Sequence, residues 1–381
     1  MALPLIPFNR PTVVGREYEY VRDAVAGGHT SSSGPFSKRA SALLREELSA
    51  ADVYLTTSCT SALEMSALLL DGRPGDTVIV PSFTFVSSAL AFARAGFGIV
   101  FADIEPTNLG IDPQHVATLL DETTRAVIAV HYGGISCDLD GLQAVLSDCE
   151  DVDLIEDNAH GLFGTHRDKP LGAFGRFSTL SFHETKNIVC GEGGALVVNR
   201  ASDIDRARVI LDKGTDRQSF LAGEIDKYTW QDTGSSFGLS DLNAAFLLAQ
   251  LEHRREILAK RRAIFEAYFD RLDRQAVELG LTLPATPNGG SSGYHSFHVL
   301  LPNTQVRDRV LRRMRDKAVQ ATFHYIPLDS SPGGRRFAAR HTDCPVTADV
   351  SSRLLRLPFY NNLTEDDVDR VVDTFVESMS G

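Results

Sequence analysis

Short, continuously apolar runs alternate with longer segments of helical periodicity between residues 53 and 200. The runs are rich in valine, isoleucine and phenylalanine and lack polar alternation, which is typical of strands buried on both faces of a sheet. Segments between them, such as Ser58 to Gly72 and Thr84 to Gly96, have the length of crossover helices, and each ends in a glycine suited to a C-terminal cap. The pattern predicts a mainly parallel sheet wrapped by helices, with strands at Val53–Thr56, Thr77–Val80, Ile99–Phe101, Ala126–Val130, Val152–Ile155, Phe177–Phe182 and Ala195–Val198.

The pattern changes after Gly238. Ser240 is a good N-cap, and helical periodicity then runs through Leu251 into an arginine- and glutamate-rich stretch that ends near Leu279, so we predict one long helix there. A patch rich in glycine, proline and serine follows at residues 284–293. Beyond it, the sequence predicts strands at residues 297–301 and 322–325 and a basic helix at residues 306–317.

The length and the change of pattern predict two domains. A chain of 381 residues is too long for one small core. We therefore predict an α/β protein with a large, mainly parallel sheet domain at residues 1–250 and a smaller α+β C-terminal domain at residues 251–381. The 43% of hydrophobic and 23% of charged residues are ordinary for a water-soluble globular protein.

Charge and cysteine usage restrict the partners and the compartment. The net charge of −12 argues against a nucleic-acid partner, although one anionic ligand in a local basic pocket remains compatible with it. No export signal opens the chain, and no uncharged apolar run is long enough to span a membrane. The five cysteines are scattered without a C-x-x-C pair, which predicts a reduced cytoplasm, no disulfide framework and no metal site.

Four segments with candidate chemistry follow predicted strands, and ligands of open α/β sheets collect beyond the carboxyl ends of strands. The first, Thr57–Ser61, opens a helix. The free N–H groups and the dipole of such a helix N-terminus can hold a phosphate, with hydroxyls of Thr60 and Ser61 nearby. An ordinary serine N-cap is the commoner explanation of this segment alone.

The second segment ends a buried strand with an acid, Asp157. A buried carboxylate is costly unless it has a charged partner, and a protonated pyridine nitrogen would be such a partner. A structural salt bridge explains Asp157 equally well on this evidence.

The third segment places Lys186 just beyond a strand, where a desolvated lysine has a lowered pKa and can attack an aldehyde as a free amine. Most lysines are solvated surface groups, so Lys186 alone is weak evidence. The glycines at Gly191–Gly194 indicate closely packed backbone or a tight turn. The fourth segment carries Phe85, an aromatic that could lie against a planar heterocycle or simply pack in the core. The four segments indicate one site more strongly together than separately.

These segments resemble the DegT/StrS type of aspartate-aminotransferase-fold enzymes, which aminate nucleotide-activated sugars. The resemblance covers essentially the whole chain. Within the family, the chain is most similar to the dTDP-4-amino-4,6-dideoxygalactose transaminase group. The segments that carry the resemblance are Ser58–Thr60, Pro81–Phe85, Glu156–His160, Ser181–Asn187, Gly191–Gly194 and Ser240–Ala245, and those similar to the group are Ile6–Asn9, Asp226–Trp230, Gly234–Ser236 and Phe323–Leu328.

The resemblance implies fold type I of the pyridoxal-5′-phosphate-dependent transferases, with that cofactor held as an imine on Lys186. Lys186 would also move the proton between the two reacting carbons, while Asp157 pairs with the pyridine nitrogen. His160 would lie near the ring hydroxyl and Phe85 on the ring face.

The resemblance also implies a phosphate site, formed by the amides of Cys59 and Thr60 with the Ser181 hydroxyl. In much of the family an asparagine of the partner subunit reaches the phosphate, and Ser236 stands at that place here. A homodimer with shared active sites follows from this arrangement. Two further positions depart from the family pattern: Asp329 replaces a usual histidine, and Asn158 with Ala159 replaces a frequent Ala-Ala pair.

The implied reaction transfers an amino group from L-glutamate, which leaves as 2-oxoglutarate, to C4 of dTDP-4-keto-6-deoxy-D-glucose. The product is a dTDP-4-amino-4,6-dideoxyhexose of galacto or gluco configuration. Lys213, Arg217 and Lys227, with Tyr228, are candidates for holding the diphosphate, although a solvated loop explains them equally well. His324 and Tyr325 could face the sugar, and a packed strand end is the plain alternative.

Three other functions fit the residues less well. A sugar dehydratase of this fold has histidine at the lysine position, so Lys186 counts against it. A non-catalytic regulator predicts loss of Lys186 or Asp157, and both are present. An NAD-binding protein is poorly supported because no G-x-G-x-x-G follows the first predicted strand.

Overall fold

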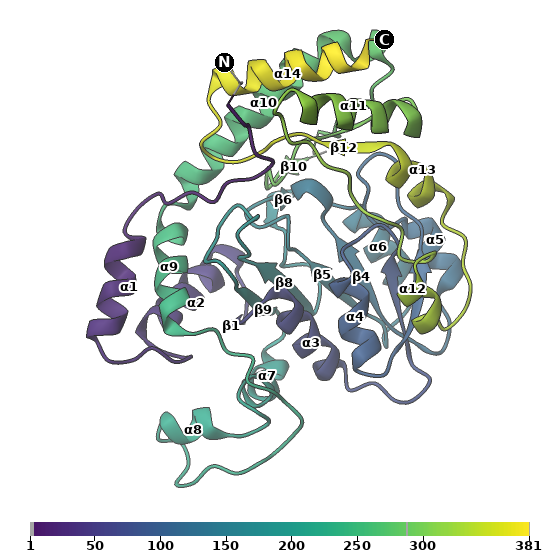
Figure 1. Cartoon of the computed structure of the whole chain (residues 1–381). Helices are drawn as coiled ribbons and strands as arrows, with labels where there is room; N and C mark the ends of the chain where they lie inside the picture. Colours follow the sequence, from purple (N-terminus) through teal and green to yellow (C-terminus); the bar gives the residue numbers. More distant parts are fainter. Residues whose placement is uncertain (1–3, 287–288, 381) are drawn as a thin grey trace.

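The computed structural model describes residues 4–286 and 289–380 (Figure 1). Its centre is a seven-stranded sheet in the order β1-β9-β8-β5-β4-β2-β3, and every predicted strand of the first domain is present with small shifts at its ends. The strands are β1 (Asp52–Thr56), β2 (Thr77–Pro81), β3 (Gly98–Ala102), β4 (Thr124–Val130), β5 (Asp153–Asp157), β8 (Phe177–Ser181) and β9 (Gly194–Val198).

The central sheet is mainly parallel, as predicted. Strands β3, β2, β4, β5 and β8 pair in parallel. Strand β9 runs antiparallel to both of its neighbours, β8 and β1. Because most strands run the same way, the ends of β2, β5 and β8 lie at one edge of the sheet, and the segments that follow them start from that edge.

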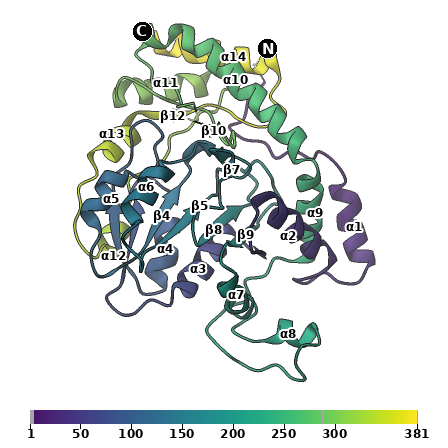
Figure 2. The ribbon, with the colours of Figure 1, turned by 180° about the vertical axis from the view of Figure 1, so that it is seen from behind.

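Helices cover both faces of this sheet (Figures 1 and 2). Alternate residues of a strand point to opposite faces, so Val78 belongs to one apolar cluster and Ile79 to another. The Val78 face is covered by α3 (Cys59–Leu70), α4 (Ser87–Arg94) and α7 (Ile204–Leu211). The opposite face is covered by α1 (Glu17–Ala26), α2 (Pro35–Leu48), α5 (Pro113–Leu119), α6 (Leu139–Leu146) and α9 (Asp241–Glu252).

The two glycines predicted as helix caps, Gly96 and Gly72, differ in their role at the helix end. Gly96, just past α4, has a φ of 97°, a conformation that glycine adopts readily. The prediction for Gly72 was wrong, because α3 ends with Asp71 in the left-handed conformation (φ 53°). Gly72 instead leaves room for the ring of Phe97, which a Cβ at that position would approach to 2.2 Å.

The single long helix predicted from Ser240 to Leu279 was also wrong. Ser240 caps α9 as predicted, and its side chain accepts a hydrogen bond from the Asn243 N–H. The helix is interrupted at His253, and α10 (Arg254–Leu279) continues in a different set of contacts. Leu251 of α9 packs with the sheet, whereas Ile264 of α10 packs in the C-terminal cluster. The first turn of α10 still packs with the sheet through Ile257, and the helix passes into the C-terminal core from Ile264 onwards.

The C-terminal part mixes helices with a two-stranded sheet of β11 (His298–Leu300) and β12 (Leu354–Arg356). Helices α10, α11 (Thr304–Asp316) and α14 (Glu365–Met379) pack together with it. The predicted strand at residues 322–325 is absent from the described chain, since only Thr322 forms a bridge, with Arg356. The remaining elements are α8 (Arg217–Leu221), α12 (Pro332–Phe337), α13 (Pro345–Arg353), β6 (Thr165–His166), β7 (Lys169–Pro170) and β10 (Gly290–Ser291).

The domain boundary at residue 250 stays a prediction. Ile6, near the start of the chain, packs in the C-terminal cluster and bridges Val319. Leu328 and Cys344 pack in a cluster of the large sheet. These three residues therefore pack with the core of the other predicted domain and not with the domain to which their position in the chain assigns them. Strand β10 lies in the predicted glycine-rich patch, of which residues 287 and 288 lie outside the described part.

Two simpler features complete the fold. No helix among the described residues has the length and apolarity needed to cross a membrane. All five cysteines carry free thiols.

The segment around α8 extends away from the body of the molecule in both views (Figures 1 and 2). We call residues 213–233 the arm.

Candidate active site

A cavity of about 450 Å³ lies at the edge of the sheet where the predicted segments meet. The start of α3, the loop after β2 and the segments after β5 and β8 line one side. Residues from the C-terminal part line the other. Nine of the predicted site residues line this cavity: Cys59, Thr60, Phe85, Asp157, His160, Ser181, Lys186, His324 and Tyr325.

The N-terminus of α3 presents open backbone donors to the cavity. The Ser58 hydroxyl accepts a hydrogen bond from the Ser61 N–H (3.1 Å), so the serine N-cap that we considered is present. The N–H groups of Cys59 and Thr60, in the first turn, have no intrahelical acceptor. Gly194 lies beneath them, and a Cβ there would come within 2.4 Å of the Cys59 nitrogen. A cap and an anion site are therefore compatible at this terminus.

Asp157 ends β5 with only 6% of its surface exposed. Its Oδ2 accepts a hydrogen bond from the Ser88 hydroxyl (2.6 Å), and its Oδ1 accepts one from the Ala159 N–H (3.3 Å). No lysine, arginine or histidine forms an ion pair with it in the described part of the chain, so the salt-bridge explanation finds no support. The carboxylate borders the cavity and can still receive a charged ligand group.

Lys186 lines the same cavity, in the loop that follows β8. Burial lowers the pKa of its amine to about 8, although the nearby Cys59 and Asp157 act in the opposite direction. Arg356 adds a further lowering. A larger fraction of this amine than of an ordinary lysine is therefore uncharged near neutral pH and able to act as a nucleophile or a base.

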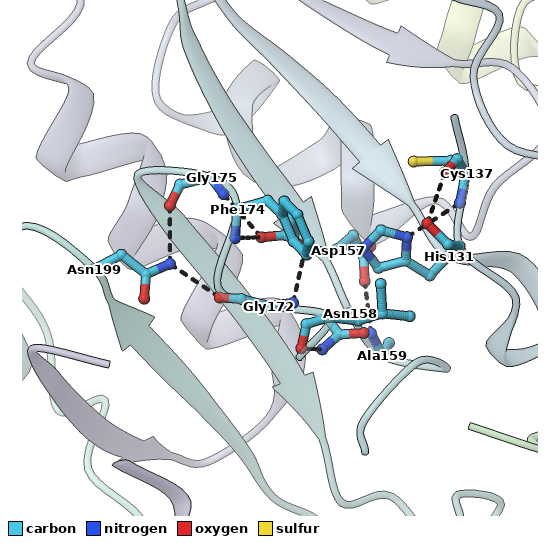
Figure 3. Close-up of polar contacts among 12 residues, drawn as sticks. His131, Cys137, Asp157, Asn158, Ala159, Gly172, Phe174, Gly175 and Asn199 are labelled. Atoms are coloured by element: carbon cyan, nitrogen blue, oxygen red, sulfur yellow. Dashed lines mark hydrogen bonds and ion pairs between the residues drawn. The ribbon is translucent and has the colours of Figure 1, made fainter. Parts of the chain in front are cut away.

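A buried hydrogen-bond network fixes the strand end that carries Asp157 (Figure 3). Glu156 is fully buried and accepts hydrogen bonds from the N–H groups of Gly172 (2.7 Å), Phe174 (2.7 Å) and Gly175 (2.8 Å). It also accepts one from His131 Nε2 (3.0 Å). Burial disfavours the carboxylate, but these donors outweigh it and lower the pKa of Glu156. We call these five residues the Glu156 network.

Asn158, one of the departures from the family pattern, belongs beside this network and not to the cavity lining. Its Nδ2 donates to the Leu171 carbonyl (2.7 Å). Asn199 Nδ2 donates to the carbonyls of Gly172 (2.9 Å) and Gly175 (2.8 Å). The other departure, Asp329, accepts a hydrogen bond from the Ser82 hydroxyl and so connects two loops.

Neutral imidazoles form one wall of the cavity. His160 stacks on His295 with ring centroids 4.0 Å apart, and its Nδ1 accepts from the Gly133 N–H (3.4 Å). His324 Nδ1 lies 3.0 Å from the Tyr132 hydroxyl. Burial, with a contribution from Lys186, holds the pKa values of His160, His295 and His324 well below the usual range.

The aromatic residues near the cavity differ in burial. Phe83 is the core residue of its loop and is fully buried. Phe85 is 57% exposed and lines the cavity, so the core explanation does not apply to it. Tyr325 also lines the cavity and packs against Phe83 at 5.6 Å between ring centroids. Its segment is not a strand end.

The predicted cofactor-binding residue Ser236 and the other predicted substrate residues lie elsewhere in the same chain. Lys213, Arg217, Tyr228 and Ser236 line a second hollow of about 1190 Å³ between α2, α7 and the arm. Both Lys213 (2.7 Å) and Arg217 (3.2 Å) form ion pairs with Asp212. Lys227 is exposed on the arm and lines neither hollow. The structure of one chain therefore does not bring these residues to His324 and Tyr325, and their role stays a prediction.

Sequence reasoning missed three residues of the site. His295, which stacks on His160, and Arg356 line the cavity, and the buried Ser88 holds Asp157 without lining it. Ser88 lies on a helix that was predicted, but no motif distinguishes it from other helix serines. His295 and Arg356 come from the C-terminal part, whose approach to the cavity depends on packing and not on local pattern.

Fold and site together define a class, the pyridoxal-5′-phosphate-dependent transferases of fold type I. The family model of the DegT/DnrJ/EryC1/StrS aminotransferase family matches residues 11–376, so the chain belongs to that family. Its members use pyridoxal phosphate, and the prediction of the cofactor and of an aminotransferase is confirmed at this level.

Individual relatives agree with this assignment. The chain is 28% identical over 384 residues to the spore coat polysaccharide biosynthesis protein SpsC of Bacillus subtilis (strain 168), covering 99% of this chain and 97% of that protein. The crystal structure of the aminotransferase TlmJ from Streptoalloteichus hindustanus is similar with a TM-score of 0.90, 29% identity and 99% coverage of both chains. The PLP-form of the putative sugar aminotransferase Spr1654 from Streptococcus pneumoniae, at 22% identity, shares the fold (TM-score 0.90, 98% of both chains).

Proposed function

We propose that the protein transfers an amino group from L-glutamate to C4 of dTDP-4-keto-6-deoxy-D-glucose and releases a dTDP-4-amino-4,6-dideoxyhexose. The observation that carries the transfer is the buried Lys186 amine, with its lowered pKa, in one cavity with Asp157 and the open N-terminus of α3. The choice of sugar is supported by the resemblance of residues 226–230 and 323–328 to the group that makes this product.

The residues of the cavity fit the cofactor. The N–H groups of Cys59 and Thr60, with the Ser181 hydroxyl, would hold the phosphate, and the absent side chain of Gly194 lets the start of α3 pack directly on β9. Asp157 would keep the ring nitrogen protonated, and Phe85 would cover a ring face. The bound cofactor supplies an electron sink for the carbon that carries the amine.

The protein's own groups would then handle the proton. Lys186 Nζ, more readily deprotonated than an ordinary lysine, would take a proton from the donor's amino-bearing carbon and give it to the second reacting carbon. His160 and His324, kept neutral by burial, would orient polar groups without adding charge.

We also infer a cytoplasmic homodimer with shared active sites. The arm exposes large apolar side chains, including 81% of Trp230, 58% of Leu221 and 49% of Tyr228. Apolar groups that gather on one protruding segment indicate a surface that another chain covers. In such a dimer, Lys213, Arg217, Lys227 and Tyr228 would hold the diphosphate and Ser236 would approach the phosphate site. The five free thiols favour a reducing compartment.

One experiment tests the proposed reaction. The purified enzyme, loaded with pyridoxal phosphate, is incubated with dTDP-4-keto-6-deoxy-D-glucose and L-glutamate, and the product is analysed by mass spectrometry and NMR. We expect an amine at C4, whose coupling constants assign the galacto or gluco configuration. A product without nitrogen would identify a dehydratase, and 2-oxoglutarate formed without sugar amination would show that the acceptor is a different ketone.

A further inference from the structure

The hydroxyl of Ser88 is committed to the carboxylate of Asp157. Ser88 is fully buried in the first turn of α4, and its Oγ lies 2.6 Å from Asp157 Oδ2. It does not line the cavity, so a bound molecule would meet Asp157 and not Ser88. An ionised carboxylate accepts hydrogen bonds and has no proton to donate, so the single proton of the Ser88 hydroxyl points to Asp157.

A second hydroxyl, that of Thr84, supports Ser88. Thr84 Oγ1 lies 2.8 Å from Ser88 Oγ, and either of these two atoms could donate the hydrogen bond. Because the proton of Ser88 is used on Asp157, Thr84 must donate and Ser88 must accept. The three side chains therefore form a chain of hydrogen bonds directed from Thr84 to Asp157, in which each bond polarises the next. We call it the hydroxyl chain.

The carboxylate of Asp157 is held at both of its oxygens. Ser88 donates to Oδ2 at 2.6 Å, and the Ala159 N–H donates to Oδ1 at the longer distance of 3.3 Å. Donors on both oxygens fix the plane of a carboxylate, and they favour its ionised form. Since no basic side chain of the described residues forms an ion pair with Asp157, the short bond from Ser88 is the main polar support of this carboxylate.

Two other buried helical serines use their hydroxyls differently. Ser66 donates to the Leu63 carbonyl (2.7 Å), and Ser378 donates to the Thr374 carbonyl (2.6 Å). Both are almost fully buried, and a carbonyl of the same helix satisfies each hydroxyl without an outside partner. Ser88 instead donates to a side chain on a different element, the end of β5, as a residue that positions Asp157 must do.

We propose that Ser88 is a positioning residue, whose hydroxyl holds the Asp157 carboxylate ionised and in a fixed plane for the ring nitrogen of the cofactor, and that Thr84 acts through Ser88. This inference rests on the pairing of Asp157 with the ring nitrogen in the proposed function, but not on the choice of sugar or amino donor. A carboxylate that is already oriented needs no reorganisation when the ring nitrogen arrives.

Two forms of the cofactor test the proposal by binding alone. The Ser88→Ala apoenzyme is titrated by equilibrium dialysis with pyridoxal phosphate and with its 1-deaza analogue, in which C–H replaces the ring nitrogen. We expect the affinity for pyridoxal phosphate to fall about 10-fold, the lower end of the range for a lost hydrogen bond to a charged group. The analogue has no nitrogen to pair with Asp157, so it should bind the variant and the wild type equally well.

The kinetics of the loaded enzyme with L-glutamate alone test the direction of the hydroxyl chain. In Ser88→Ala, the rate of amine uptake at saturating glutamate should fall about 10- to 100-fold, while the half-saturating glutamate concentration stays the same. Thr84→Val keeps the shape without the hydroxyl, and its smaller loss should vanish in the Ser88→Ala background, because Thr84 acts only through Ser88. Ser378→Ala, which also loses a buried helical hydroxyl, is the matched control and should change neither affinity nor rate.

Three outcomes would overturn the proposal. Equal losses of affinity for pyridoxal phosphate and for the analogue would make Ser88 a structural residue. Wild-type affinity and rate in Ser88→Ala would show that Asp157 needs no support from this hydroxyl. A Thr84→Val loss that persists in the Ser88→Ala background would place Thr84 in direct contact with the ligand. If Ser88→Ala fails to fold, Thr84→Val carries the same comparison of the two cofactor forms, with a smaller loss that must again be confined to pyridoxal phosphate.

A further variant separates this proposal from the proposed function. Wild-type affinity and rate in Asp157→Asn would reject the pairing of Asp157 with the ring nitrogen, and the role of Ser88 with it. An inactive Asp157→Asn beside a fully active Ser88→Ala would reject the role of Ser88 alone. Failure of the wild-type enzyme to aminate the sugar, with the expected binding of both cofactor forms, would reject the proposed acceptor but not the role of Ser88.

Discussion

The cavity and the arm were both predicted to contribute to the active site, but the structure holds them in very different ways. In the cavity, Asp157 is fixed by Ser88, and the strand that carries it is fixed by the Glu156 network. On the arm, Lys213 and Arg217 form ion pairs with their neighbour Asp212, and Lys227 is exposed.

The difference separates two kinds of site residue. Cavity residues are positioned by a rigid sheet edge before any ligand arrives, which is what proton transfer at a defined carbon requires. Arm residues depend on what covers the arm, since Trp230 is 81% exposed and its indole N–H donates to the carbonyl of Asp232, in the arm itself. Substitutions in the cavity should therefore affect chemistry or folding strongly, and substitutions on the arm should affect substrate binding moderately.

Removal of the Lys186 amine should produce the largest effect. In Lys186→Ala, no group remains at the cavity to move the proton, and we expect the rate of amine transfer to fall by at least about 1000-fold. The protein should fold normally, because removal of a buried amine relieves its desolvation and breaks no hydrogen bond of its side chain among the described residues. Measurement of 2-oxoglutarate release with circular dichroism as a folding control tests this. Retention of more than a few per cent of the activity would remove Lys186 from the mechanism.

Glu156→Gln tests how far the cavity depends on its buried network. A glutamine amide cannot accept all four hydrogen bonds, and its NH₂ group would face a donor, so we expect a loss of about 2–4 kcal/mol in the free energy of unfolding. Urea unfolding measures this, with the exposed Glu150→Gln as control. Wild-type stability in the Glu156 variant would show that the network does not hold the strand end.

The carboxylate of Glu156 also predicts a loss of folding stability at acid pH. The pKa of Glu156 is lowered in the folded protein, so its contribution is fully present above the unfolded value of 4.5 and is lost as the pH falls through the folded value. Unfolding experiments below pH 4.5 should show a steeper loss of stability with falling pH in the wild type than in Glu156→Gln. Parallel curves for the two proteins would contradict this assignment.

Lys186 predicts a dependence on pH in the alkaline range. Its folded pKa of about 8 lies below the ordinary value of 10.5, so the apoenzyme binds fewer protons than the unfolded chain between these values. Stability of the apoenzyme should therefore rise from pH 8 to pH 10.5, and uptake of pyridoxal phosphate should accelerate as the pH rises through 8. Stopped-flow absorbance measures the uptake, and a rate that is flat between pH 7 and pH 9 would contradict a lowered pKa.

The sequence located the cavity well because its residues follow strands whose burial is visible as apolar pattern. Asp157 and Lys186 stand at such ends, and the sheet fixes the order in which they meet. The break at His253 and the loop at residues 322–325 could not be predicted, because both depend on contacts between distant segments. Arg356 was missed for the same reason, because it reaches the cavity only through the packing of the C-terminal part.

The smallest effect is expected on the arm, from Lys227→Ala. If the arm of a partner holds the diphosphate, the KM for the sugar nucleotide should rise by roughly 3- to 10-fold, since an exposed charge contributes about 1 kcal/mol, while the KM for glutamate stays the same. The effect should shrink at high ionic strength, which screens an exposed charge more than a buried one. Lys169→Ala, at an exposed position on β7, is the control. Equal changes in both KM values would show that Lys227 does not bind the sugar nucleotide. The arm and the cavity would then not form one substrate site.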